Sequence, residues 1–539
     1  MNRTPLGEKR KQNRPYKRWT DDFKEKRETA TIFQIQIFPR VSRVRQSAFM
    51  YLFYTPIKVV LGLRKCVSAR VWPEKNDIGD ERLSPVKEYL LYLEKENAVG
   101  SGVKQPKVAL GYGACHDLFV NATSFLNFKD LKGPPEHFNE ITSKEEFLKS
   151  FAYFFKHGAA AERFMSNSDL YDQLVEEALT LPDTRWAIGG NAPLMARRFF
   201  MEGWKVLLAA KMSKKLKEYI PKEIEIVGAD DTEEVKDDVH MILEYKADQQ
   251  FGAFKSPRAN RYIMHNDENN PLLSSLEKLG DGLGKFKPNL LVISGLQMMD
   301  NFPFKKNGRD LRAERLDLVK EQILSQPLDT LSHFEMASYV DLELLTHLTT
   351  KVLPYVDSVG MNEQELSNLY NVLEYGEVIV VADSNPRIAT ALDQMRKTFH
   401  LIRMKNNEYQ SKREITRIHV HTLAYQAILT VKDSDWKRTE AAAAKASLTA
   451  HRYVCNNQKI SLDKSKLLLD DSFSTTTDND NNSRVFFEPS KPVACWDEDL
   501  NNTKVEICVA PVLICTEAQL TAGAGDNISA AGLVLQIEK

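Results

Sequence analysis

Apolar and polar positions in the second half of the chain follow a pattern that predicts strands separated by helices. Short apolar runs at 290–293 and 378–381, and the alternating stretch at 417–421, have the length of strands, and residues 309–325 have the spacing of an amphipathic helix. Strands that alternate with helices indicate a parallel sheet with helices on both faces. We therefore expect an α/β fold built on a doubly wound, mainly parallel sheet.

The first half of the chain predicts a more mixed set of elements. Residues 84–97 fit an amphipathic helix, and residues 107–113 have the pattern of a buried strand. Three short strand-like runs follow at 206–208, 223–227 and 241–245. Together they suggest a small β-rich unit set among helices.

The last thirty residues carry the strongest candidate chemistry. An apolar run at 509–515 leads into a glycine-rich turn and then a helix of small residues that begins near Asp526. Gly523 and Gly525 would let the backbone approach an anion, toward which the free N–H groups of a helix start point. Asp526 would then take a proton from a hydroxyl while those N–H groups hold a transferring phosphoryl. A glycine-rich turn with an aspartate N-cap explains the same residues, so the motif alone is weak.

Two other stretches place polar residues after a predicted strand, where open α/β sheets bind ligands. Asp117 follows the strand at 107–113 and could accept hydrogen bonds from a polyol; a turn residue or a cap would look the same. Gly189, Gly190 and Asn191 form a plausible binding loop, and a helix cap is an equal interpretation of that stretch.

Two pairs of residues could serve a metal ion. Asn362 and Glu365 are three apart at a predicted helix start, so they share a face and could hold Mg²⁺ through water. A capping box explains the same pair and is the interpretation that the spacing favours. His333 and Glu335 face the same side of a predicted strand and could touch the outer shell of the metal, although a strand histidine is more often simply hydrogen-bonded.

Composition narrows the class of protein only slightly. The chain has 539 residues, 42% hydrophobic and 27% charged, with a net charge of −1. This length predicts two to four domains, and a net charge near zero gives no support for nucleic-acid binding. Six cysteines contain no C-x-x-C pair, but four of them, Cys455, Cys495, Cys508 and Cys515, lie in the C-terminal fifth. One structural disulfide there is possible if the compartment is oxidising.

The N-terminal segment differs from the rest in charge. Residues 1–50 carry 13 Lys+Arg against 5 Asp+Glu, and an apolar stretch follows at 48–63, interrupted by Pro56 and Lys58. This stretch is short for a membrane-spanning helix, which needs about 20 apolar residues. We expect an internal signal or membrane anchor; the alternative is a disordered basic tail before a helix that packs on the core.

One late stretch is of low complexity. Residues 470–483 (DDSFSTTTDNDNNS) predict a disordered loop. Asn481-Asn482-Ser483 and Asn501-Asn502-Thr503 are glycosylation sequons, which matter only if the chain enters the secretory pathway.

Short motifs spread over residues 100–539 support one family. They lie at 158–163 (GAAAER), 189–192 (GGNA), 259–261 (ANR), 294–296 (SGL), 333–335 (HFE), 362–365 (NEQE), 417–422 (RIHVHT) and 523–526 (GAGD). In this order they resemble the ribokinase-like sugar kinases, and within these the ADP-dependent glucokinases of eukaryotic type. No single motif is specific, but the set is.

This resemblance implies transfer of the β-phosphoryl of ADP to the 6-hydroxyl of glucose, which gives AMP, with one or more Mg²⁺ ions. The residues that match the family in each role are Asp526, Gly523 and Gly525 for catalysis; Asp117, Glu162, Gly189, Gly190 and Asn191 for the sugar; Arg261, Thr521 and Ala524 for the nucleotide; and Glu335, Asn362, Glu365, His333 and Asp526 for the metal. A lid drawn from about 117–265 would close over the substrates and exclude water.

The resemblance also sets expectations for the whole chain. We expect a basic segment at 1–75, a kinase domain at 76–539, a monomer, and a place in the endoplasmic reticulum, or in the cytoplasm if the N-terminal stretch is neither signal nor anchor. One departure is Gly113, where the family usually has asparagine, which puts tight glucose binding in doubt. The rival interpretations are an ADP-dependent phosphofructokinase, an ATP-using relative, and a non-catalytic membrane-associated protein.

Overall fold

The computed structural model describes residues 80–98, 105–228, 235–306, 309–383, 385–478 and 483–537. All of them belong to one unit, Lys75–Lys539. The predicted signal or anchor within residues 1–75 lies outside the described residues. In the parts of the chain that are described, no helix has both the length and the apolar content needed to cross a membrane.

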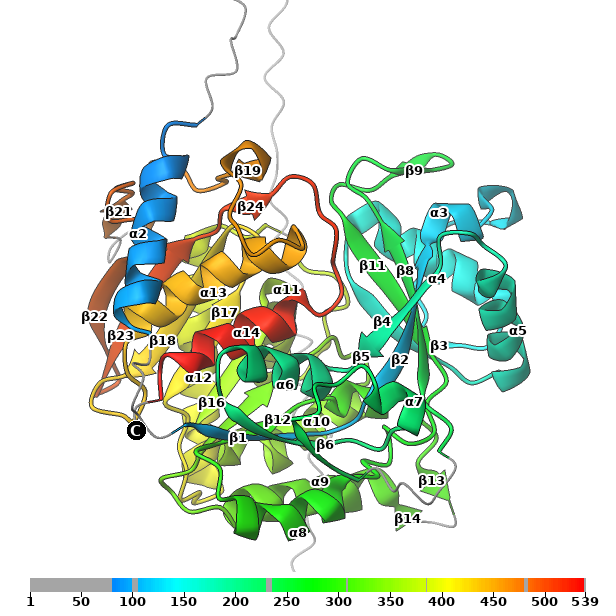
Figure 1. Cartoon of the computed structure of the whole chain (residues 1–539), viewed down its shortest axis with the longest axis horizontal. Helices are drawn as coiled ribbons and strands as arrows, with labels where there is room; N and C mark the ends of the chain where they lie inside the picture. Colours follow the sequence, from blue (N-terminus) through cyan, green and yellow to red (C-terminus); the bar gives the residue numbers. More distant parts are fainter. Residues whose placement is uncertain are drawn as a thin grey trace, which may run out of the picture. The chain divides into compact units, whose positions relative to one another are not determined.

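A ten-stranded sheet forms the centre of this unit (Figure 1), in the order β22-β23-β18-β17-β16-β15-β12-β1-β6-β7. Its strands are β1 (Lys107–Gly111), β6 (Lys205–Ala209), β7 (Glu225–Val227), β12 (Leu290–Ile293), β15 (Leu331–Glu335), β16 (Ser358–Asn362), β17 (Arg417–His421), β18 (Tyr425–Val431), β22 (Ala494–Leu500) and β23 (Thr503–Pro511). From β7 to β17 all neighbours are parallel, and β18, β23 and β22 add an antiparallel edge. The chain builds outward on both sides of β1, so the sheet has a switch point there.

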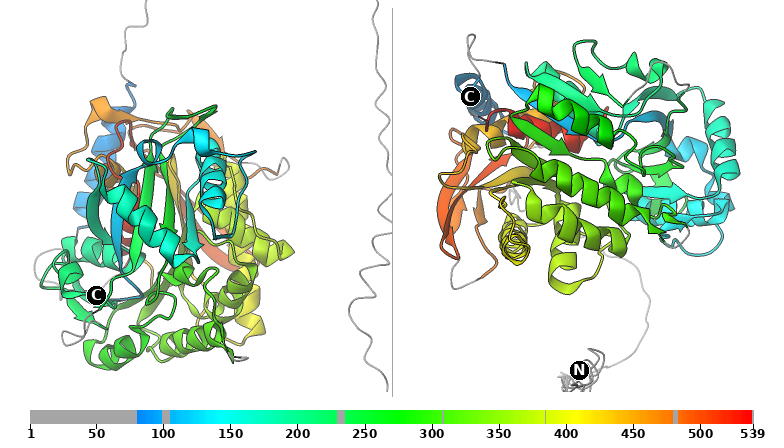
Figure 2. Two further views of the ribbon diagram at one scale, coloured as in Figure 1. Left: turned by 90° about the vertical axis from the view of Figure 1, so that its right-hand side faces the viewer. Right: turned by 90° about the horizontal axis from the view of Figure 1, so that it is seen from below.

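Helices cover both faces of this sheet, as the view from below shows (Figure 2, right). One face is packed by α8 (Leu276–Phe286), α9 (Leu311–Leu324), α10 (Leu342–Lys351), α11 (Glu363–Tyr375) and α12 (Ile388–Glu408). The other face is packed by α2 (Leu83–Glu96), α6 (Asn191–Met201), α7 (Lys214–Lys217), α13 (Thr439–Val454) and α14 (Ala524–Val534). The predicted fold class, a doubly wound and mainly parallel α/β sheet, is confirmed.

A second sheet of six strands lies beside the first (Figure 1), in the order β3-β4-β11-β8-β2-β5. Its strands are β2 (Cys115–Asn121), β3 (Glu140–Ile141), β4 (Ala161–Met165), β5 (Arg185–Gly189), β8 (Val239–Tyr245) and β11 (Asn260–His265). The helices α4 (Lys144–His157) and α5 (Ser168–Leu179) bury their apolar residues, including Phe147, Phe151 and Phe155, against one face. We call this six-stranded sheet with α4 and α5 the lid.

Short elements complete the described fold. They are α3 (Ala122–Phe125), β9 (Gln250–Phe251), β10 (Phe254–Lys255), β13 (Lys305–Lys306), β14 (Arg309–Asp310), β19 (Ser465–Lys466), β20 (Ser472–Ser474), β21 (Arg484–Phe486) and β24 (Ile514–Cys515), with 3-10 turns at Phe128–Asp130, Leu296–Met299, Leu353–Tyr355 and Leu462–Lys464.

Three predictions about strands need correction. The runs at 206–208 and 223–227 belong to the large sheet as β6 and β7, and only 241–245 lies in the lid. Residues 378–381 form no strand; the Ile379 N–H donates to the Asn368 side chain at 2.9 Å, and Val380 and Val381 pack on the lid core. A short apolar run shows burial, but it does not show whether the backbone pairs with a sheet.

The predicted disordered loop at 470–483 is partly regular structure. β20 pairs with β21, and the backbone of Thr475 and Thr477 is tied to α12 by Arg396 and Asp393. Composition missed these contacts because they come from a helix far away in sequence. Two disulfides join Cys455 to Cys515 and Cys495 to Cys508, whereas the sequence indicated that one disulfide was possible in this part of the chain.

Candidate active site

A cavity of about 990 Å³ lies between the carboxyl ends of the central strands and the lid. It brings together most of the side chains and glycines that the sequence pointed to: Asp117, Glu162, Gly190, Asn191, Arg261, Glu335, Asn362, Glu365, Thr521, Gly523, Ala524, Gly525 and Asp526. Gly189 and His333 are not among the lining residues; each contacts one of them, Asp117 and Glu335 respectively.

The start of α14 presents an anion-binding surface to this cavity. The helix begins at Ala524, two residues before the predicted start, and Gly523 caps it with φ +74°. A Cβ on Gly523 would overlap the side chain of Leu194, so this position needs glycine for both its backbone angle and its space. The N–H groups of Ala524, Gly525 and Asp526 have no acceptor within the helix because they form its first turn.

Asp526 is held at this helix start by an amide relay. The Asn191 Nδ2 donates to Asp526 Oδ1 at 2.7 Å, and the Gln297 Nε2 donates to Asn191 Oδ1 at 2.6 Å. Burial, together with the nearby charge of Glu335, raises the pKa of Asp526 to about 6. A carboxylate with such a pKa is suited to accept a proton from a hydroxyl near neutral pH. Asn191, predicted to contact the sugar, thus orients the Asp526 carboxylate.

Asp117, on β2 of the lid, is another carboxylate that lines the cavity. Burial, the largest effect, raises its pKa to about 7. Its Oδ1 is buried and accepts no hydrogen bond from any described residue. A Cβ on Gly189, in the neighbouring strand β5, would overlap this carboxylate. Gly189 therefore makes room for Asp117, and an unpaired buried carboxylate oxygen beside a cavity is suited to bind a hydroxyl ligand.

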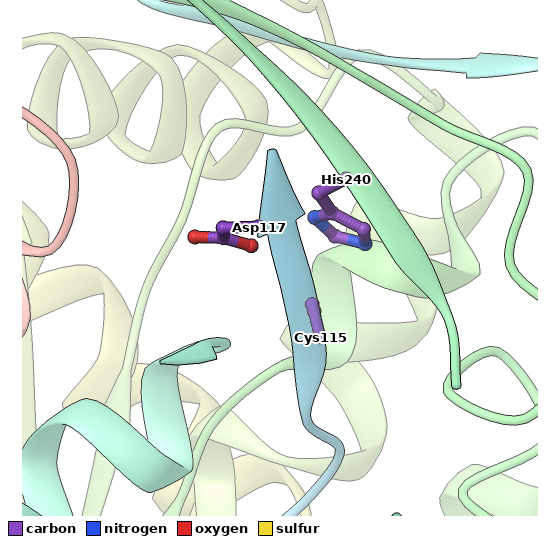
Figure 3. A group of neighbouring side chains, drawn as sticks. All are labelled: Cys115, Asp117 and His240. Atoms are coloured by element: carbon purple, nitrogen blue, oxygen red, sulfur yellow. The ribbon is translucent and has the colours of Figure 1, made fainter. Parts of the chain in front are cut away.

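His240 is a cavity residue that sequence reasoning missed. It lies opposite Asp117 in the pairing of β2 with β8, and Figure 3 shows both side chains with Cys115. Its Nε2 donates to both Asp267 oxygens, at 2.9 and 3.0 Å, and its Nδ1 lies 3.5 Å from Glu162 Oε1. The sequence predicted a strand-like run at 241–245 but gave no sign of a role for His240, because Asp267 lies 27 residues away.

Asp267 is the centre of a buried polar network behind His240. His265 Nδ1 lies 3.2 Å from Asp267 Oδ1, and the Asn270 Nδ2 donates to Asp267 Oδ2 at 2.8 Å. Among the described residues, the two groups of three ligand-type side chains close enough to hold a metal ion lie here and share His240. Because Asp267 already accepts hydrogen bonds from His240 and Asn270, we describe these side chains as a network that orients His240.

Asn270 also explains why this chain has glycine at position 113, where the family usually has asparagine. It holds the backbone of Ala114 through its Oδ1 and Nδ2, each at 3.1 Å. Gly113 has φ +77°, and a Cβ there would come within 2.6 Å of Asn270 Oδ1. In this chain Asn270 therefore fills the space beside Gly113.

Three of the predicted metal residues, Glu335, Asn362 and Glu365, face the same cavity. Asn362 and Glu365 form a full capping box at the start of α11, as the spacing favoured. Glu335 accepts hydrogen bonds from Ser529 and His333. Burial would raise the pKa of Glu335, but hydrogen bonds from His333 and His421 outweigh it and lower the pKa to about 2. His333 has both ring nitrogens engaged, by Ser358 and Glu335, so it supports Glu335 from behind.

The donor set around Glu335 fits a divalent cation. Burial raises the pKa of Glu365 to about 7, and the charge of Glu335 adds to the raised pKa of both Glu365 and Asp526. These carboxylates repel one another, and a cation between them would relieve that repulsion. Oxygen ligands from carboxylates, with water filling other positions, are what Mg²⁺ prefers.

The lid and the C-terminal loop meet at the edge of the cavity. The Thr521 hydroxyl donates to Glu244 Oε1 on β8 at 2.7 Å, and Ala522 packs against Phe119 and Ile242 of the lid. Arg261, on β11, points its buried Nε at no acceptor among the described residues. Arg258 instead binds the Gly158 carbonyl and Glu363. Arg261 is thus the better placed of the two arginines for a ligand phosphate.

The fold of this unit is that of ADP-dependent kinases of known structure. A solved ADP-dependent kinase in complex with fructose-6-phosphate and ADPβS aligns with a TM-score of 0.60 at 19% identity, over 85% of this chain and 98% of that chain. This structural match shows that the two proteins share a fold.

More narrowly, the chain belongs to the ADP-specific phosphofructokinase/glucokinase family, whose conserved region matches residues 106–535. It is 31% identical to an ADP-dependent glucokinase of Bos taurus, over 79% of this chain and 84% of the relative. It is 29% identical to a probable ADP-dependent glucokinase of Caenorhabditis elegans, over 83% of this chain and 88% of the relative.

Proposed function

We propose that this protein transfers the β-phosphoryl of ADP to the 6-hydroxyl of glucose and releases glucose 6-phosphate and AMP. The observation that carries the proposal is the position of Asp526, a buried carboxylate at an anion-binding helix start, in the same cavity as the unpaired carboxylate oxygen of Asp117. The names of the bovine and nematode relatives support ADP and glucose as substrates.

Different residues of the cavity would carry out the proton transfer and the stabilisation of the phosphoryl charge. Asp526, oriented by Asn191, takes the proton of the sugar hydroxyl as that oxygen attacks phosphorus. The N–H groups of the α14 start hold the negative charge of the transferring phosphoryl, and Arg261 is placed to bind the same group. The bond from the β-phosphorus to the bridging oxygen breaks, and AMP leaves with that oxygen.

A divalent cation, Mg²⁺ in our proposal, would be held by Glu335, Glu365 and Asn362 through water. When bound, it neutralises charge on the nucleotide phosphates. The lid excludes water from the cavity, so that the phosphoryl passes to the sugar and not to water.

The charge of the sugar end favours glucose over a sugar phosphate. Asp117 and Glu162 line this end, with Asp526 near, and the first two lie on the lid. The phosphate of a sugar phosphate bound at this end would be repelled by these carboxylates. This disfavours a phosphofructokinase, which must bind fructose 6-phosphate.

We also propose that the protein is a monomer that works in an oxidising compartment, the endoplasmic reticulum, and reaches it through residues 1–75 with membrane association. Two disulfides in the C-terminal part support this location, because disulfides persist in the secretory pathway and are rare in the cytosol.

The test is a kinase assay of the full chain with Mg²⁺, offering glucose or fructose 6-phosphate, each with ADP or ATP. We expect product only from glucose with ADP. Product from fructose 6-phosphate would refute glucose as the proposed acceptor. Product with ATP but not with ADP would refute ADP as the proposed donor. No product from any pair, with a folded protein by circular dichroism, would favour a non-catalytic protein.

A further inference from the structure

The β22–β23 hairpin ends in an exposed glycosylation sequon. Its two turn residues, Asn501 and Asn502, have φ +53° and +66°, as a two-residue turn of this hairpin type requires. Thr503, the first residue of β23, completes Asn501-Asn502-Thr503. Asn501 and Asn502 are both exposed at the tip of the hairpin.

The Asn501 side chain is open to modification. Its Nδ2 contacts His400 Nδ1 at 2.9 Å, and His400 is itself exposed. A glycosylated asparagine keeps one hydrogen on Nδ2, so this contact survives. No residue of the hairpin tip lines the cavity between sheet and lid, so a glycan there leaves the kinase site clear.

A disulfide in the same hairpin points to the compartment where such glycans are added. Cys495 and Cys508 are direct partners across β22 and β23, and they are joined. With Cys455–Cys515, four of the cysteines in the described chain are paired, and Cys115 is the remaining one there. Disulfides and N-linked glycans both arise in the oxidising secretory pathway.

The position also has a structural use for a glycan. β22 is the last strand of the ten-stranded sheet and is seven residues long, and no strand of the described residues pairs with its outer edge. Such edges can pair with another chain unless something protects them. A glycan at the end of this strand would block the approach of a second edge.

We propose that Asn501 carries an N-linked glycan. The donor is an oligosaccharide linked to a lipid diphosphate. A bond forms between Asn501 Nδ2 and the anomeric carbon, the bond from that carbon to the phosphate oxygen breaks, the lipid diphosphate leaves, and the amide loses one proton. The modification is independent of phosphoryl transfer. If no glycan is found on Asn501, the proposed kinase activity is therefore unaffected.

The test expresses the full chain in a eukaryotic cell and maps the peptide of residues 494–504 by mass spectrometry, with and without peptide-N-glycosidase. Asn501→Gln is compared with Asn502→Gln, which keeps Asn501 and Thr503. Both variants lose an asparagine from a turn position with positive φ, so both carry the same cost to the fold.

We expect a glycan on the wild type and on Asn502→Gln, and none on Asn501→Gln or Thr503→Ala. All four proteins should retain kinase activity within about twofold, which serves as the check of folding. An unmodified Asn501 in wild type with Cys495–Cys508 formed would overturn the proposal. An unmodified Asn501 with Cys495 and Cys508 reduced would overturn it as well, because the secretory compartment itself would then be wrong.

Discussion

Burial is the largest influence on the pKa of four carboxyl groups that face the cavity, Asp117, Glu335, Glu365 and Asp526. It raises the pKa of Asp526 to about 6, and those of Asp117 and Glu365 to about 7. Glu335 is the exception, since hydrogen bonds from histidines overcome burial and lower its pKa to about 2. One cavity thus contains a permanent anion and groups that exchange protons near neutral pH, as acid–base chemistry requires.

The role of Asp526 as base predicts a specific loss. An asparagine at this position keeps an oxygen for the Asn191 Nδ2 but cannot take a proton. We expect Asp526→Asn to lower kcat by about 10²–10⁴-fold, with the KM for glucose changed little. Steady-state kinetics measure this, and Asp183→Asn, at an exposed aspartate outside the cavity, is the control. Turnover that survives in Asp526→Asn would show that another group is the base.

Gly189 predicts a loss of sugar binding alone. A Cβ there overlaps the Asp117 carboxylate, so Gly189→Ala must displace Asp117. We expect a rise of at least about tenfold in the KM for glucose, equal to about 1.4 kcal/mol, with nucleotide affinity unchanged. Gly284→Ala is the matched control, because a Cβ at Gly284 in α8 meets nothing within 4 Å. Equal glucose kinetics in the two variants would remove Asp117 from the sugar site.

The Asp267–His240 pair predicts a pH-dependent stability. Burial would lower the pKa of His240, but the charge of Asp267 raises it well above 6.5. Protonated His240 therefore stabilises the fold fully below the unfolded pKa, and this contribution is lost as the pH rises through the folded pKa. Breaking a buried pair costs about 3–5 kcal/mol.

We therefore expect Asp267→Asn to lose stability, and to lose more near about pH 6 than at alkaline pH. Urea unfolding of the full chain at both pH values measures the difference. Asp183→Asn should follow the wild type at both. A loss that is independent of pH would mean that His240 is neutral in the folded protein.

At the scale of elements, the sequence could not predict which segments far apart in the chain contact one another. The pattern of strands and helices in 290–421 was sufficient for the fold class, because strand–helix alternation is local. The division of 206–208, 223–227 and 241–245 between two sheets depends on which strand lies next to which, and periodicity carries no such information. For the same reason 378–381 looked like a strand although it packs without pairing.

The same limit applies to the site. Gly523, Gly525 and Asp526 were found because their chemistry lies in four consecutive residues. His240, Gln297 and Asp267 were missed because each acquires its role from a partner on another strand or loop. Asn362 and Glu365 were found, and their capping box shows that a local structural role and a place in the cavity can coincide.

The contact between the lid and the C-terminal loop predicts that ADP is cleaved only when sugar is bound. Glu244 accepts from Thr521 at 2.7 Å and also lies 3.4 Å from Arg185. Glu244→Ala removes the contact across the cavity edge, whereas Arg185→Ala leaves it. We expect Glu244→Ala to hydrolyse ADP to AMP and phosphate without sugar at a rate several-fold above wild type, because water enters the cavity. Arg185→Ala should not; a similar rise in both variants would place the effect in Arg185.

At the scale of the whole molecule, two sheets enclose one cavity, and the reaction we propose uses both. The large sheet and the helices packed on it carry Asp526, which we propose as the base, the start of α14, and Glu335 and Glu365, which we propose as metal ligands. The lid contributes Asp117, Glu162, His240 and Arg261. We therefore expect transfer of the β-phosphoryl from ADP to the sugar to require both the large sheet and the lid.

The most direct measurement of this account is label transfer from ADP that carries radioactive phosphorus in its β-phosphoryl, with glucose, Mg²⁺ and the full chain. The account predicts label in glucose 6-phosphate and an equal amount of unlabelled AMP. Label that remains in ADP, or appears only as inorganic phosphate in the presence of glucose, would contradict it.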